Sequence, residues 1–184
     1  YVLQKLTTEE KNKALQTAAN DLCERQEEIL AANVLDLENG KNNGMNPGLL
    51  DRLKLTGERI AQIAEGLRQI AALPDCIGET MEHFERPNGL KIDKVRVPLG
   101  VIGIIYEARP NVTADAFGLC FKTGNAVILK GGSDAIHSNI AIVKVLQDAL
   151  EACSMPRTAV QLIEDTDRAV TAQFMKMKEY VDVL

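Results

Sequence analysis

The second half of the chain alternates short apolar runs with stretches of helical periodicity, and this alternation most constrains the fold. Four runs are expected to be buried strands: 101–106, 126–129, 160–163 and 181–184. Three helix-compatible stretches lie between them: 112–122, 135–152 and 167–178. Because strand and helix alternate, we expect an α/β fold with a Rossmann-like parallel sheet and helical crossovers.

Helices are predicted for the first part of the chain. Thr7 and Glu10 form a capping-box pair at the start of one helix, which is expected to continue to about Asn39. A turn-rich loop follows at 42–48. A second helix is predicted over 56–73, because apolar residues recur on one of its faces. These helices are interpreted as packing elements.

A β-hairpin arm is predicted at 84–99. Asn88 and Gly89 form the dipeptide most typical of a tight hairpin turn. The arm after the turn alternates apolar and charged residues, as a half-solvated strand does. Because an unpaired strand edge can pair with another chain, we expect this arm to join subunits into a homo-oligomer.

The composition excludes several classes of protein. The 184 residues carry a net charge of −5, and no basic run exceeds two residues, which argues against nucleic acid as a partner. No apolar stretch approaches a membrane span, and the first 20 residues lack the apolar segment of a secretory signal. The four cysteines have no CxxC spacing and there are two histidines, so we expect no metal site, reduced thiols and a cytoplasmic location.

Two strand ends carry the residues best suited to bind a ligand. In an open parallel sheet, ligands bind beyond the carboxyl ends of the strands. The first predicted strand ends in the string 106–111, and the second ends in Lys130, Gly131, Gly132 and Ser133. Bare backbone amides, a helix start and an ammonium group together suit a phosphate or a ribose. The alternative is an ordinary strand-to-helix turn with a solvated lysine.

Longer strings indicate a family. Residues 98–103, Asn111 and the string at 124–130 resemble the cofactor domain of the aldehyde dehydrogenase superfamily. The strings at 106–135 and 49–60 are similar in particular to its gamma-glutamyl phosphate reductase branch. The resemblance covers nearly the whole chain. It implies one nucleotide-binding domain over residues 1–184, with a helical lead-in at 7–73, the hairpin arm at 84–99 and the α/β part at 100–184.

The resemblance also implies roles for individual residues. Lys130 matches a lysine that contacts the adenosine ribose or its 2′-phosphate, and Asn111 matches an asparagine that donates to the oxyanion of the reacting carbonyl. Arg109 could pair with a carboxylate or phosphate of an acidic small-molecule substrate, or brace its loop from the surface. Asp134 could reach a ribose hydroxyl or cap the following helix.

The implied reaction is the NADPH-dependent reduction of L-glutamate 5-phosphate to L-glutamate 5-semialdehyde in proline biosynthesis. The superfamily's nucleophile is a cysteine in a Gly-Asn-Cys string, which none of the four cysteines here matches. Cys120 is expected to be a buried structural thiol. The catalytic cysteine is therefore expected beyond Leu184, and the chain alone is not expected to catalyse. Two alternatives remain: another aldehyde dehydrogenase acting in the oxidative direction, and a non-catalytic nucleotide-binding or oligomerising module.

Overall fold

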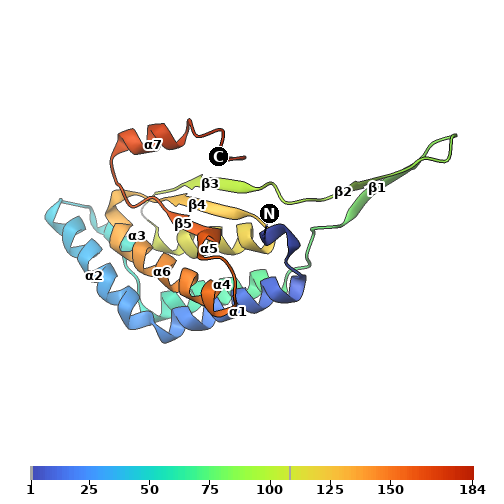
Figure 1. Cartoon of the computed structure of the whole chain (residues 1–184). Coiled ribbons are helices and arrows are strands. Elements are labelled where there is room, and N and C mark those ends of the chain that lie inside the picture. Colours follow the sequence, from blue (N-terminus) through green and yellow to red (C-terminus); the bar gives the residue numbers. More distant parts are fainter. Residues whose placement is uncertain (1, 108) are drawn as a thin grey trace.

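Three parallel strands form the central sheet of the computed structural model, which describes residues 2–107 and 109–184 (Figure 1). They are β3 (Val101–Ile105), β4 (Ala126–Lys130) and β5 (Val160–Leu162), in the order β3-β4-β5. The predicted fourth strand is reduced to a single parallel bridge between Ile102 and Val183 on the free side of β3. Read across the sheet, the order is β5, β4, β3 and then the Val183 bridge, so the strands appear third, second, first and fourth in chain order. This order is typical of a doubly wound fold.

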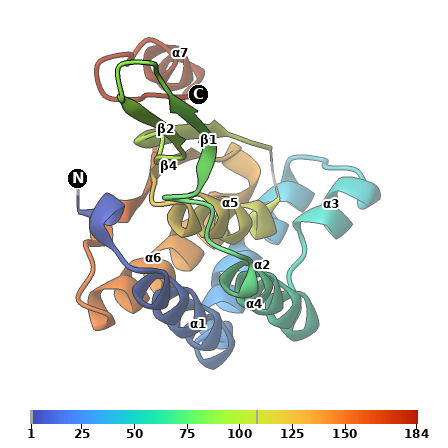
Figure 2. The ribbon, with the colours of Figure 1, turned by 90° about the vertical axis from the view of Figure 1, so that its right-hand side faces the viewer.

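This strand order decides which face each crossover helix covers. α5 (Pro110–Lys122) and α6 (Ile136–Ala152) connect strands that advance in one direction, and both lie on one face of the sheet (Figure 1). The next crossover runs back past β3, and a right-handed connection in that direction must cover the opposite face. α7 (Arg168–Phe174) lies there (Figures 1 and 2). This helix is shorter than the predicted stretch 167–178.

α7 packs against the sheet at a glycine of β3. A Cβ built on Gly103 would lie 2.8 Å from Cζ of Phe174, 2.7 Å from Cδ1 of Leu184 and 3.2 Å from Cγ1 of Val181. Because Gly103 has no side chain, the ring of Phe174 is buried directly over the strand. The parallel α/β architecture predicted from the alternation of strands and helices is thus confirmed.

The first part of the chain forms a second helical layer, which packs on α5 and α6 on the side away from the sheet (Figure 2). It consists of a short 3₁₀ turn, η1 (Leu3–Lys5), and the long helices α1 (Thr8–Glu24), α2 (Gln26–Asn42) and α4 (Gly57–Ala72). The capping box of Thr7 and Glu10 is confirmed. The single helix expected up to Asn39 is wrong, because Arg25 leaves helical geometry with φ −101° and ψ 22° and divides it in two.

The predicted loop at 42–48 is also partly wrong, because α3 (Pro47–Leu53) begins inside it. The side chain of Asn46 accepts a hydrogen bond from the Leu49 N–H at 2.9 Å, and Pro47 occupies the first helical position. An Asn cap followed by Pro is a strong helix start, which the turn-like composition of the segment concealed.

The hairpin consists of β1 (Thr80–Glu85) and β2 (Lys91–Val95), paired antiparallel and separate from the central sheet. Gly89 has φ +82°, as the turn requires. The hairpin projects from the body of the molecule (Figures 1 and 2), and every residue of both strands is exposed. The first strand begins earlier than the predicted boundary at residue 84, and neither face is buried by this chain.

One hydrophobic core joins the helical layer to the sheet. Phe117 and Phe121 of α5 stack at its centre, with ring centroids 5.3 Å apart. Two further 3₁₀ turns, η2 (Ser133–Ala135) and η3 (Arg157–Ala159), connect α6 to the neighbouring strands. Among the described residues, no helix is long and apolar enough to cross a lipid bilayer.

Candidate functional site

The two strand ends singled out in the sequence lie at the same edge of the sheet. Ile105, the last residue of β3, is paired with Lys130, the last residue of β4. The ladder continues one residue further, because the N–H of Tyr106 donates to the carbonyl oxygen of Lys130 at 3.1 Å. The loop after β4 and the segment leading into α5 therefore begin side by side.

Lys130 is buried, with 4% of its surface exposed. Within residues 2–107 and 109–184, its ammonium makes one hydrogen bond, to the carbonyl oxygen of Gly131 at 3.2 Å. The alternative of a solvated lysine in a turn is therefore wrong. A buried ammonium group with N–H bonds to spare suits an anion or a hydroxyl as its partner.

Gly131 is enclosed by two polar side chains. A Cβ built on it would lie 2.4 Å from Nδ2 of Asn139 and 3.3 Å from the ring of Tyr106. Only glycine fits this position without displacing its neighbours. The loop then passes through Gly132 into η2, where Ser133 and Asp134 are exposed to solvent.

The expected helix-capping role of Asp134 is taken by another residue. Two N–H groups in the first turn of α6, those of His137 and Ser138, donate to the carboxylate of Asp36 on α2 at 3.1 and 2.8 Å. Asp134 is thus left with an exposed carboxylate in the segment that follows Lys130, which leaves the ribose-binding hypothesis in place.

A buried chain of hydrogen bonds lies next to the loop that follows β4. The hydroxyl of Thr113 on α5 donates to Oδ1 of Asn139 at 2.8 Å and lies 2.7 Å from the hydroxyl of Tyr106. Because the one proton of Thr113 is used, the Tyr106 hydroxyl donates to Thr113. Burial raises the pKa of Tyr106 to about 12, the bond with Thr113 opposes this rise, and the phenol stays protonated at neutral pH.

The far end of this chain is unsatisfied. Nδ2 of Asn139 is buried and has no hydrogen-bond partner among the described residues. It faces the backbone of Gly131. Buried amide groups are nearly always paired, so this donor marks the loop as a place where the protein accepts a polar group.

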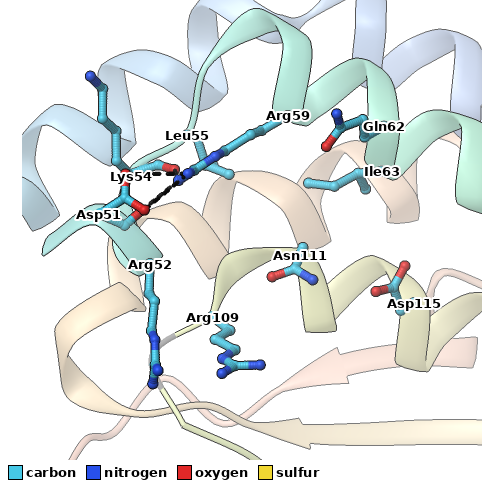
Figure 3. A pocket seen from close by; sticks show the side chains of 10 residues that line it. All are labelled: Asp51, Arg52, Lys54, Leu55, Arg59, Gln62, Ile63, Arg109, Asn111 and Asp115. Carbon is cyan, nitrogen blue, oxygen red and sulfur yellow. Dashed lines mark hydrogen bonds and ion pairs between the residues drawn. The ribbon is translucent and has the colours of Figure 1, made fainter. Parts of the chain in front are cut away.

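Arg109 and Asn111 line a pocket of about 360 Å³ between α5 and the segment that joins α3 to α4 (Figure 3). Asn111 lies in the first turn of α5 and is exposed. Asp115 lies one turn further along the same helix. Burial raises the pKa of the Asp115 carboxyl above its ordinary value, and a hydrogen bond from Asn111 opposes this rise.

Arg59 on α4 holds the opposite wall of the pocket together. Its guanidinium donates to the carbonyl oxygen of Lys54 at 2.7 Å and to that of Asp51. It also pairs with the Asp51 carboxylate at 3.2 Å (Figure 3). The C-terminal turn of α3 is thus tied to α4.

Sequence reasoning missed Asn139, Thr113 and the cationic residues of the 49–60 segment. That segment was singled out only through its family resemblance, and its helical periodicity indicated packing. Nothing in the local sequence around Asn139 distinguishes it from an exposed helix residue, because its partners lie on other elements.

Similarity to known proteins identifies the family. The sequence pattern of the aldehyde dehydrogenase family matches residues 2–183 of this chain. The chain belongs to the aldehyde dehydrogenase family. Within this family, it is 58% identical over 184 residues to the gamma-glutamyl phosphate reductase of Heliobacterium modesticaldum, covering all of this chain and 44% of that protein.

The fold of this chain is also similar to solved structures of two enzymes named gamma-glutamyl phosphate reductase. The crystal structure of gamma-glutamyl phosphate reductase from Thermotoga maritima matches with a TM-score of 0.96 at 43% identity, covering 99% of this chain and 44% of that one. The enzyme of that name from Saccharomyces cerevisiae matches with a TM-score of 0.89 at 30% identity, covering 99% of this chain and 47% of that one. This chain therefore spans less than half the length of these relatives.

Three of the four cysteines of this aldehyde dehydrogenase chain lie in the hydrophobic core or pack against it. Cys120 on α5 is buried, as predicted, and burial raises its pKa to about 11, so it is a thiol at neutral pH. Cys23, Cys76 and Cys153 are half-buried and free of disulfides.

Proposed function

We propose that this chain is the cofactor-binding part of an enzyme that reduces L-glutamate 5-phosphate to L-glutamate 5-semialdehyde in proline biosynthesis. The observation that carries the proposal is the hydrogen bond from the Tyr106 N–H to the Lys130 carbonyl oxygen. It sets the loop suited to a nucleotide beside the segment that leads to Arg109 and Asn111. The high identity to relatives named gamma-glutamyl phosphate reductase supports the choice of substrate. Residues 1–184 then form one nucleotide-binding domain.

The loop after β4 fits a nicotinamide dinucleotide, and we place NADPH there. When bound, this cofactor supplies the hydride for reduction of the acyl group. The spare N–H bonds of Lys130 would hold the ribose or its 2′-phosphate, and the exposed carboxylate of Asp134 would accept from a ribose hydroxyl. Gly131 lets the chain pass close to Asn139, Gly132 is half-buried with no side chain to cover its backbone, and Ser133 adds a hydroxyl donor at the start of η2.

The pocket at the start of α5 is assigned to the acidic substrate. The Asn111 amide donates to the carbonyl oxygen on which negative charge develops, and the N-terminal end of α5 favours the same charge. Arg109 precedes the helix and offers a guanidinium to a carboxylate or phosphate of the substrate.

We also propose that the protein is a cytoplasmic homo-oligomer. The exposed hairpin of β1 and β2 offers unpaired edges that a second copy could extend into a homo-oligomer. A biosynthetic reductase that uses NADPH is expected in the cytoplasm.

The test uses the full-length protein with L-glutamate 5-semialdehyde, phosphate and NADP⁺, in the oxidative direction of the same reaction. Wild type is expected to reduce NADP⁺, and Asn111→Ala is expected to lower kcat by about 10²- to 10³-fold, as loss of one oxyanion donor does. Asn43→Ala, on the exposed end of α2, is the control and should leave kcat unchanged.

Three results would contradict this proposal. Turnover of simple aldehydes without phosphate, and none of the semialdehyde, would favour an oxidative aldehyde dehydrogenase. Cofactor binding without any turnover would favour a non-catalytic module. An Asn111→Ala variant as active as Asn43→Ala would remove the oxyanion role from Asn111.

A further inference from the structure

The 49–60 segment forms one wall of the pocket that contains Arg109 and Asn111. Arg52 comes from the last turn of α3, Lys54 from the loop after it, and Arg59 from the first turn of α4 (Figure 3). The function proposed above uses none of these residues. They stand opposite the start of α5, where the acidic substrate is placed above.

The pocket concentrates positive charge. Four cationic and two carboxylate side chains line it, although the whole chain carries a net charge of −5. Asp51 is engaged by Arg59, whereas no ion pair within the described residues engages Arg52 or Arg109. Two guanidinium groups on one pocket, neither with a counter-ion among the described residues, favour an anionic ligand.

The two unpaired guanidinium groups reach the pocket from opposite walls. In Figure 3, the side chains of Arg52 and Arg109 extend in the same direction, and both residues line the pocket together with Asn111. Lys54 points away from them in the same view. The anion they favour therefore lies at the end of the pocket near Arg52, and Asn111 faces the middle of the pocket.

Arg59 fixes the turn that carries Arg52. Its guanidinium binds the carbonyl oxygens of Asp51 and Lys54, the residues just before Arg52 and two positions after it. These bonds hold one carbonyl group of the last turn of α3, which a helix end otherwise leaves free, and one of the residue that caps it. The backbone of Arg52 is therefore held in place before any ligand arrives, which lowers the entropic cost of binding.

We propose that Arg52, together with Arg109, binds the α-carboxylate of the substrate and so makes the enzyme specific for an acidic acyl phosphate. This inference rests on the proposed function. Asn111 receives the reacting carbonyl, and Arg52 receives the charged group at the other end of the same molecule. Arg59 acts as a positioning residue through its bonds to the turn of α3.

The experiment compares two aldehydes in the full-length protein, with NADP⁺ and phosphate present. L-Glutamate 5-semialdehyde carries the α-carboxylate, and pentanal has the same chain length without it. Arg52→Gln is expected to raise KM for the semialdehyde about 10- to 100-fold with kcat within about threefold, because the loss of a charged contact affects binding rather than chemistry. Its kcat/KM for pentanal should equal that of wild type.

Lys54→Gln is the matched control, because it removes one positive charge from the same wall while its side chain points away from Arg109 (Figure 3). It should change KM for the semialdehyde less than about twofold, as expected for a solvated rim charge. Arg52→Lys keeps the charge without the planar fork and should give an intermediate KM. Equal thermal midpoints of all variants would confirm that they fold.

The outcomes separate the two proposals. If wild type turns over the semialdehyde but Arg52→Gln behaves like Lys54→Gln, the role of Arg52 is overturned and the proposed function stands. An equal loss for both aldehydes in Arg52→Gln also overturns it, since it shows general damage. Wild type that turns over pentanal but not the semialdehyde overturns the proposed function and the role of Arg52 with it.

Discussion

Asp36 and Ser138 are 102 residues apart in the chain and form the cap of α6. Oδ2 of Asp36 accepts from the backbone N–H of Ser138 at 2.8 Å and from its hydroxyl at 2.6 Å. Asp36 is 1% exposed, so its charge is compensated by these donors and by the positive end of the helix rather than by water. The cap joins α2 to the helix that follows the proposed cofactor loop.

Asp36→Ala should therefore destabilise the protein by about 2 to 4 kcal/mol, because it removes a helix cap and leaves buried donors unsatisfied. Urea unfolding of the full-length protein measures this, and hydrogen exchange should show faster exchange at the amides of His137 and Ser138. Glu38→Gln, on an exposed position of the same helix, is the control and should leave both unchanged. Unchanged exchange at His137 in Asp36→Ala would show that the cap is dispensable.

Gly103→Ala is expected to loosen α7. The new methyl group would meet Phe174 and Leu184 at less than the usual contact distance, 2.8 and 2.7 Å. Overpacking of this kind costs about 1 to 3 kcal/mol. Limited proteolysis should cut the segment around α7 faster than in wild type. Gly48→Ala, whose new methyl group would lie no closer than 3.4 Å to its neighbours, should show the wild-type pattern. Equal cleavage of both variants would contradict the close packing.

Asp148 on α6 should make stability depend on pH. Burial tends to raise its pKa, but hydrogen bonds from Arg25 and Arg157 outweigh this and lower the pKa below its ordinary value of 3.8. A carboxyl pKa that is lowered by folding adds stability at pH values above the pKa of the unfolded state. That stability is lost as the pH falls through the pKa of the folded state.

Asp148→Asn should thus destabilise at pH 7 by about 0.5 to 1 kcal/mol, the range for partly exposed ion pairs. The difference from wild type should shrink as the pH falls below 3.8 and vanish once the carboxyl is protonated. Urea midpoints measured at pH 7 and over this acidic range test it. A difference that persists unchanged at the lowest pH would mean that the ion pairs contribute nothing.

Lys130→Met should weaken the binding of NADPH more than the binding of NADH. The substitution keeps most of the buried apolar stem and removes the charge. Loss of a charged contact to the 2′-phosphate, worth about 1.5 to 3 kcal/mol, corresponds to about 10- to 150-fold weaker NADPH binding, with a smaller effect on NADH. Fluorescence titration of the full-length protein with both cofactors measures this. An equal loss of both would place Lys130 on the common ribose, and no loss would contradict the assignment of this loop.

Deletion of residues 86–94 should reduce the mass of the assembly. These residues include the turn and most of β2, and every residue of both hairpin strands is exposed in the single chain. Light scattering of the full-length protein with and without the deletion measures the mass, and circular dichroism checks that the body stays folded. An unchanged mass would exclude the hairpin from the subunit interface.

Local features of the sequence determined the elements of the fold. The alternation of apolar runs with helical periodicity predicted the parallel sheet, the pairing of Thr7 with Glu10 predicted the start of α1, and Asn88-Gly89 predicted the hairpin turn. Each of these signals is contained within a few residues, because helix capping, turn geometry and side-chain periodicity are local properties of the backbone.

Tertiary packing alone decided how the site is built. The cap on α6 comes from Asp36 rather than Asp134, Lys130 is buried rather than solvated, and Arg52 and Arg109 line one pocket. These relationships join residues that are distant in the chain. Their partners depend on how helices and strands pack, and a buried polar group must find its hydrogen bonds wherever that packing places a donor or acceptor.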